Sequence, residues 1–124
     1  MRVLLLVFTG GGLGSVLRYL MSRWFNETMI SAFPFGTFVV NIIGCFFIGF
    51  VIFYTERYGE QADTWRLFLA TGLCGGFTTF SAFSLENAQL ISDQRILIFL
   101  LYTAGSVILG LLATYLGLLA GRGI

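Results

Sequence analysis

Glycines and residues with hydroxyl side chains cluster at residues 70–84, which read ATGLCGGFTTFSAFS in the middle of an apolar stretch. Several glycines close together weaken a helix at one place. They are Gly72, Gly75 and Gly76, and the hydroxyl residues are Thr71, Thr78, Thr79, Ser81 and Ser84. An unpaired backbone group in hydrocarbon is costly, so irregular backbone there must face protein, water or an ion. The pattern is typical of an ion site in a broken helix, whose freed carbonyl or N–H groups point inward.

A purely structural interpretation of the same glycines is equally open. Small residues let two membrane helices approach closely, and a kinked helix at such a crossing needs no ion. The first apolar stretch also carries small residues, since Gly10 and Gly14 form a GxxxG pattern. The segment by itself therefore predicts a break in a membrane helix, with or without a bound ion.

The whole chain is far more apolar than a soluble domain. Of its 124 residues, 57% are hydrophobic and 10% are charged, whereas soluble domains average about 25% charged residues. A soluble protein of this length could not bury so much apolar surface. We expect one all-α integral membrane domain over residues 1–124, without a separate soluble module. The net charge of +1 indicates no basic face for nucleic acid.

Four apolar stretches predict four membrane-spanning helices of about the 20 residues that a bilayer requires. They cover about residues 3–24, 34–54, 67–91 and 96–120, and the third contains the expected break. The first stretch lacks a cleavage site, so we interpret it as a retained span rather than a signal peptide. Four spans place both termini on one side. Arginines number four on that side and two or three on the other, which permits insertion in both orientations.

Two polar side chains inside the first two spans each allow two interpretations. Asn41 shares a helical face with Thr37 and is the only carboxamide of its span. It is either a link between helices, with a stabilisation of about 0.6 to 2 kcal/mol, or a donor to an anion through its NH₂ group. Arg18 lies near the end of the first span. It either extends to the membrane interface or attracts anions at the mouth of a water-filled path.

Aromatic and polar side chains also lie on defined faces of the last two spans. They are Phe80, Phe83 and Asn87 on the third span, and Tyr102, Ser106 and Gly110 on the fourth. Aromatic residues at this spacing are usually packing residues, but their ring edges are electropositive and an anion can lie against them. Glu86, near the far end of its span, is interpreted as reaching water.

The residue types give little support to enzyme chemistry. The chain has no histidine, no lysine for a Walker A loop and no pair of inward carboxylates. Cys45 and Cys74 lie in apolar segments outside any CxxC pattern, so we expect buried, reduced thiols. Cation paths usually carry acidic side chains. Here the available groups are N–H and O–H donors and ring edges, which favours a path for anions.

Three motifs resemble the CrcB, or Fluc, family of fluoride channels. They are GGGLGSVLRY in the first span, GTFVVNIIGCFFIG in the second and TGLCGGFTTFSAFS in the third. The resemblance implies a passive, fluoride-selective channel in the bacterial plasma membrane that exports cytoplasmic fluoride and lowers its toxicity. It also implies an antiparallel, dual-topology homodimer in the lipid bilayer, with two pores at the subunit interface and a central structural sodium ion (Na⁺).

The resemblance assigns roles to individual residues. It implies a pore-lining amide at Asn41, ring edges along the path at Phe80 and Phe83, and a vestibule cation at Arg18. The sodium ligands would be the backbone carbonyls of Gly75 and Thr78. The expected path also includes the hydroxyls of Thr37, Ser81, Tyr102 and Ser106. Two departures are Ala82, where many members have Thr, and Gly110, where some have Ser. Gly110 lies at the outer end of the polar row that Tyr102 and Ser106 begin, so the sequence does not assign a polar group to that end.

Two other function classes fit parts of the sequence. A small proton-coupled multidrug-type exporter would need an acid deep in a span, and the first, second and fourth spans contain none. A non-transporting subunit that packs against partners would explain the glycines but not the clustered polar side chains.

Overall fold

The structure is a computed structural model that describes residues 1–123, and every element in that range is helical. The long helices are α1 (Arg2–Thr28), α2 (Phe35–Tyr54) and α6 (Ile96–Gly123). The shorter elements between α2 and α6 are η1 (Thr55–Gln61), α3 (Ala62–Arg66), η2 (Leu67–Cys74), α4 (Gly75–Phe77) and α5 (Phe80–Ser92). The predicted all-α class is confirmed.

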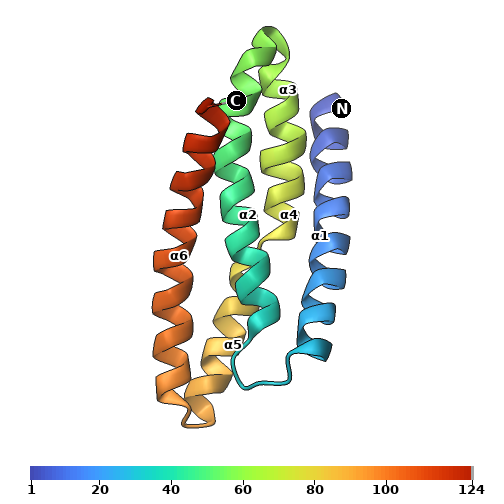
Figure 1. Cartoon of the computed structure of the whole chain (residues 1–124). Coiled ribbons are helices and arrows are strands. Elements are labelled where there is room, and N and C mark those ends of the chain that lie inside the picture. The colour runs from blue at the N-terminus through green and yellow to red at the C-terminus, as the bar shows by residue number, and fades with distance from the viewer. Residues whose placement is uncertain (124) are drawn as a thin grey trace.

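Three stretches of the described residues are long and apolar enough to cross a membrane: Arg2–Thr28, Phe35–Ser92 and Ile96–Gly123. The second has 58 residues and folds back on itself at η1, so that α3 and α4 lie beside α2 (Figure 1). Gly59 in η1 has a φ of 52°, in the left-handed region that favours glycine. Many large apolar side chains point outward, as lipid-facing helices require. The chain is therefore a membrane protein, as predicted.

Glycines bring α1 directly against η2 and α4. A Cβ atom at Gly14 would collide with the carbonyl oxygen of Leu73, and it would lie 2.8 Å from the backbone nitrogen of Phe77. On the opposing segment, a Cβ atom at Gly76 would collide with the carbonyl oxygen of Gly11. The two backbones thus touch without intervening side chains, which is the close approach expected of small residues in membrane helices.

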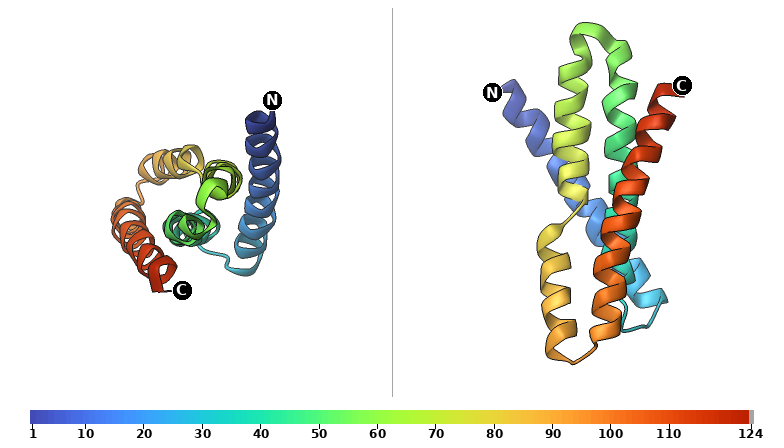
Figure 2. Two further views of the ribbon diagram at one scale, coloured as in Figure 1. Left: turned by 90° about the horizontal axis from the view of Figure 1, so that it is seen from above. Right: turned by 90° about the vertical axis from the view of Figure 1, so that its left-hand side faces the viewer.

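A second crossing of this kind joins α2 and α6, which lies across the bundle from α1 (Figure 2). A Cβ atom at Gly49 would collide with the carbonyl oxygen of Thr114, and one at Gly117 with that of Phe46. The helices α1 and α6 are therefore both held by backbone contact, each on its own side of the central segments. The N-terminus and the end of α6 lie at the same end of the bundle as η1 (Figure 1).

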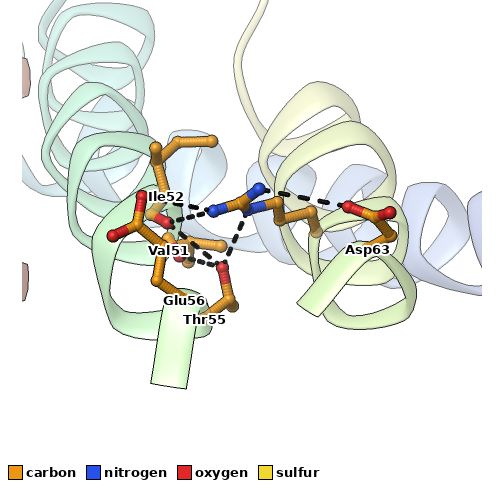
Figure 3. A network of polar contacts seen from close by, with 6 residues as sticks. Val51, Ile52, Thr55, Glu56 and Asp63 are labelled. Atoms are coloured by element: carbon orange, nitrogen blue, oxygen red, sulfur yellow. Dashed lines mark hydrogen bonds and ion pairs between the residues drawn. The ribbon is translucent and has the colours of Figure 1, made fainter. Parts of the chain in front are cut away.

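The mixed charges after α2 do more than keep this connection soluble. The Arg66 guanidinium donates hydrogen bonds to the Ile52 carbonyl at 3.0 Å and to the Thr55 hydroxyl at 3.1 Å (Figure 3). The last carbonyls of a helix lack ladder donors, and a basic side chain can supply them. An ion pair with Glu56 at 3.5 Å completes the contact. Arg66 thereby satisfies acceptors at the end of α2. It also holds α3, the start of the segment that runs back beside α2, against that end.

Candidate functional site

The returning helix is interrupted at Thr78 and Thr79. Thr78 has φ −83° and ψ 157°, and Thr79 has φ −148° and ψ 122°, so both have extended backbone. Gly75 is still helical, with φ −62° and ψ −38°. The interruption therefore begins three residues after Gly75 rather than at it. The short helix α4 separates it from η2, a π-helical segment, and such segments are frequent at functional sites.

Asn41 of α2 holds this interruption open. Its side-chain Nδ2 donates to the Thr79 carbonyl at 3.0 Å, and its Oδ1 accepts from the Thr79 N–H at 2.8 Å. The carboxamide thus pairs with both backbone groups of one extended residue, so neither is left unsatisfied in the membrane. A carboxamide NH₂ has two N–H donors. Asn41 therefore links two helical segments, and the second N–H of its carboxamide can donate to a ligand.

The interruption removes the helical donors of two carbonyls. In a continuous helix the Gly75 carbonyl would accept from the Thr79 N–H, and the Thr78 carbonyl from the Ala82 N–H. The Thr79 N–H instead donates to Asn41, and the Ala82 N–H donates to the Thr79 hydroxyl at 3.2 Å, which caps α5. The carbonyls of Gly75 and Thr78 have therefore lost their ladder donors. These are the two carbonyls to which the family resemblance assigns a sodium ion.

A cavity of about 380 Å³ lies beside the interruption. Predicted site residues on its wall are Asn41, Gly75, Thr78, Phe80, Phe83 and Ser106. The Ser106 hydroxyl is buried and has no hydrogen-bond partner among the described residues. No charged side chain of the described residues lines this cavity. Its polar wall is therefore made of neutral groups.

The aromatic side chains form a row that leads away from this cavity. The ring centroids of Phe80 and Phe83 are 5.7 Å apart, and those of Phe83 and Tyr102 are 5.0 Å apart. Phe80 is 78% exposed, whereas Tyr102 is fully buried. The row thus runs from a ring that is open to the surroundings to one that is enclosed within the bundle.

Glu86 lies at the enclosed end of this row, where it is half-buried and also has partners within the protein. Its carboxylate accepts from the Thr37 hydroxyl at 2.6 Å and from the Tyr102 hydroxyl at 2.7 Å. Glu86 therefore joins α5 to α2 and α6. The available sequence signal was its spacing, since Phe80, Phe83 and Glu86 follow one another at intervals of three residues on one helical face.

Beyond Glu86 lies a second cavity of about 460 Å³. Its wall combines Glu86 with Gln89, Asp93 and Arg95, together with residues of the α1–α2 connection such as Asn26. It is markedly more polar than the first cavity. Phe83 lines the first cavity and Glu86 the second, and Tyr102 contacts both of these residues.

Four predicted site residues line neither cavity: Arg18, Thr37, Ser81 and Tyr102. Arg18 is a half-buried residue of α1 and lines neither cavity. The exposed Ser81 has its hydroxyl 3.2 Å from that of Thr79 and belongs to the capping of α5. Sequence reasoning also missed the role of Thr79, whose backbone pairs with Asn41. Nothing in a single sequence identifies such a partner.

Comparison with known proteins shows the family to which the chain belongs. The chain matches the family described as CrcB-like protein, Camphor Resistance (CrcB), over residues 5–118. The fluoride-specific ion channel FluC of Flavobacterium psychrophilum is 48% identical over 122 residues, which cover 98% of both chains. The protein of the same name from Phocaeicola vulgatus is 49% identical over 118 residues, covering 95% of this chain and 97% of its own. The predicted family is confirmed, and the chain belongs to the CrcB-like family.

Proposed function

We propose that this chain is a passive, fluoride-selective ion channel. Its relatives carry the name of fluoride-specific channels over nearly their whole length. The structural observation that supports this function most directly is the first cavity. Its wall includes Asn41 and Ser106, whose hydroxyl has no partner among the described residues, and no acidic side chain of those residues. Neutral donors can replace the water around a small anion and still release it, as conduction requires.

The row of aromatic rings extends this path toward the second cavity. Ring edges are electropositive, so Phe80 and Phe83 can pass an anion along without trapping it at a fixed charge. At the far end, the Thr37 and Tyr102 hydroxyls already donate to a negatively charged group, the carboxylate of Glu86. Each hydroxyl has a single proton, so it must turn away from the carboxylate in order to donate to a passing fluoride. Arg18 remains a proposed vestibule residue.

We place four spans in the membrane: α1, α2, the interrupted segment from η2 to α5, and α6. We further propose an antiparallel homodimer with two pores at the subunit interface. Phe80 supports a partner, because a large ring that is 78% exposed stands on the wall of the first cavity. A second copy of the chain would cover it and close the path. We place this dimer in the bacterial plasma membrane, where it exports cytoplasmic fluoride.

The residues of the interruption fit a structural sodium ion. The Gly75 and Thr78 carbonyls lack ladder donors, and oxygen ligands suit a hard cation. A Cβ atom at Gly75 would meet nothing closer than the Ala70 carbonyl oxygen at 3.8 Å, so packing within one chain does not require glycine there. The missing side chain instead leaves room outside the chain. Two antiparallel copies would each present these carbonyls, and a bound sodium ion would add positive potential beside an anion path.

One observation favours a proton-coupled exporter as a second candidate. Glu86 is a partly buried acid between α2 and α6, and proton relays use such groups. The function that we propose predicts that Glu86 orients donors and carries no proton across the membrane.

A flux assay in liposomes separates the candidate functions. Purified protein is reconstituted with internal fluoride, and charge is balanced with a potassium ionophore at equal pH on both sides. We expect rapid fluoride release and, with internal chloride, release that is slower by more than about a hundredfold, since a narrow path of close donors excludes larger anions. Release that needs a pH gradient would support the exporter. Equal release of both anions would reject fluoride selectivity, and no release would favour a packing subunit.

A further inference from the structure

Two thiols from different helical segments line the first cavity. Cys45 comes from α2 and Cys74 is the last residue of η2, and both are free cysteines. Cys74 is 4% exposed, and Cys45 is half-buried. Neither residue belongs to the donor set proposed for fluoride. Because both thiols lie on the wall of one cavity, we considered which ligands other than fluoride two thiols can bind.

The packing around these residues holds their two segments together. A Cβ atom at Gly44 would collide with the Thr78 side chain and lie 3.2 Å from the Phe77 ring, so α2 touches the segment that follows Cys74. On the other side, α6 passes over Cys45, since a Cβ atom at Gly110 would lie 3.5 Å from its sulfur. The absence of a side chain at Gly110 therefore leaves the Cys45 sulfur room beside α6.

The ligand set restricts the metal ions that these thiols can bind. The described residues contain no group of three or more His, Cys, Asp or Glu side chains that could hold a metal ion. Zinc sites in proteins almost always use three or four such ligands. Thiolates select soft metal ions, and mercury(II), silver(I) and copper(I) are stable with two sulfur ligands in a linear arrangement.

We propose that Cys45 and Cys74 form a two-thiolate site for a soft, two-coordinate metal ion. For mercuric chloride, two S–H and two Hg–Cl bonds break and two S–Hg bonds form, while two protons and two chloride ions pass to water with no change of oxidation state. Neutral mercuric chloride can reach the site through lipid or through the cavity. Given the proposed function, a metal ion that joins α2 to η2 beside Asn41 and Thr78 also blocks the fluoride path.

The first test measures metal binding without reference to transport. The intact dimer is prepared without reductant, treated with mercuric chloride, washed with a monothiol and analysed by mass spectrometry. We expect one mercury atom per chain and the loss of two protons. In the matched variants Cys45→Ser and Cys74→Ser, a single S–Hg bond should not survive the wash. Zinc chloride serves as the control metal and should leave no adduct.

The second test measures fluoride flux in liposomes before and after the same treatment. Each protein is compared with its own untreated flux, and its folding is checked by its elution profile. We expect mercury to reduce wild-type flux by at least about tenfold, because conduction requires an open path. Either serine variant should resist the block after the wash. Cys45→Ala and Cys74→Ala replace any serine variant that does not fold.

Several outcomes would overturn the site. They are two mercury atoms per chain, retention of mercury by a single-cysteine variant as firmly as by the wild type, or a persistent block in that variant. A lack of fluoride flux in untreated liposomes would instead reject the proposed function. The mass measurement would still decide whether the two thiols bind one metal ion.

Discussion

The two halves of the segment from η2 to α5 are held to the rest of the chain in different ways. Before the interruption, η2 and α4 lie against α1 through glycine backbone contacts, such as that of Gly14 with Leu73. Among the described residues, the only side-chain hydrogen bond between α1 and these two segments is a long one, from the Ser15 hydroxyl to the Gly76 carbonyl at 3.5 Å.

After the interruption, α5 is fastened to its neighbours by side-chain hydrogen bonds. Glu86 accepts from Thr37 of α2 and from Tyr102 of α6. The Thr103 hydroxyl of α6 also donates to the Asn87 side chain at 3.1 Å. Hydrogen bonds between side chains therefore gather in the half where the proposed path runs, whereas the other half is held mainly by close backbone packing.

This difference has a physical reason. Membrane helices gain no hydrophobic driving force by leaving lipid, so close packing and hydrogen bonds are the means of association. Close packing tolerates no space for an ion, whereas a hydrogen-bonded junction supplies polar groups that a passing anion can use. The first half thus serves as a rigid support for the second, and Thr78 and Thr79 are the joint between them.

The largest expected effect comes from Asn41→Asp, which changes the side chain that pairs with the extended Thr79 backbone. The new carboxylate still accepts from the Thr79 N–H, but it cannot donate to the Thr79 carbonyl and it places a negative charge on the path. We expect fluoride flux to fall by at least about a hundredfold, since one unfavourable charge in a site of low dielectric outweighs several neutral contacts. Liposome flux and the elution profile of the same preparation measure this.

A matched variant shows whether the position of that charge matters. Asn87→Asp introduces the same charge on α5 at a residue that does not line the first cavity, and it should retain most of the flux. If Asn87→Asp were as inactive as Asn41→Asp, the local interpretation of Asn41 would fail. Normal flux in a folded Asn41→Asp protein would leave Asn41 as a link between helices and no more.

Gly14→Ala tests the half that relies on shape. Its methyl group would meet backbone atoms of Leu73 and Phe77 that cannot move aside easily. Overpacking of this kind costs about 1–3 kcal/mol, and we expect that loss in the free energy of unfolding, measured by denaturant titration in detergent micelles. Gly12→Ala on the same helix is the control, because a Cβ atom there meets nothing within 4 Å. Equal stability of the two variants would contradict the described α1 packing.

Phe80→Ile and Phe83→Ile test the aromatic row in the polar half. An aliphatic side chain of similar bulk retains much of the packing but lacks an electropositive edge. We expect each variant to conduct fluoride about tenfold more slowly, if one ring edge contributes on the order of 1 kcal/mol to the passing ion. Flux is measured with protein of unchanged elution profile. Wild-type conduction in both would make the pair ordinary packing residues.

The smallest effect is expected from Thr103→Val, which removes a hydrogen bond of α5 away from the path. Single hydrogen bonds between membrane helices contribute about 0.6 kcal/mol on average. We therefore expect a loss of that order in unfolding free energy and flux within about twofold of wild type. Thr37→Val is the matched comparison on α2, since its hydroxyl donates to Glu86, and it should lower flux more than it lowers stability. Equal effects of the two valine variants would show that the hydroxyls only fasten α5.

The helical class and the membrane location were predictable because they depend on local properties. Long apolar stretches with few charges can satisfy their backbone groups in lipid only within helices or barrels. The glycines and hydroxyls at residues 70–84 also showed that regular helix would be weak there. The position of the interruption was predicted less well, because Gly75 remains helical and the extended residues are Thr78 and Thr79. The partner that favours Thr79 over Gly75 lies on another helix.

The amino-acid sequence by itself determined the apolar stretches, the small residues at the crossings and the motifs that identify the family. Only the tertiary structure decided which polar groups meet. It paired Asn41 with the Thr79 backbone, joined Glu86 to Thr37 and Tyr102, and placed the Arg66 guanidinium at the end of α2. Helical periodicity indicates the face on which a side chain lies. It does not contain the axial offset between neighbouring helices, and that offset determines which donor reaches which acceptor.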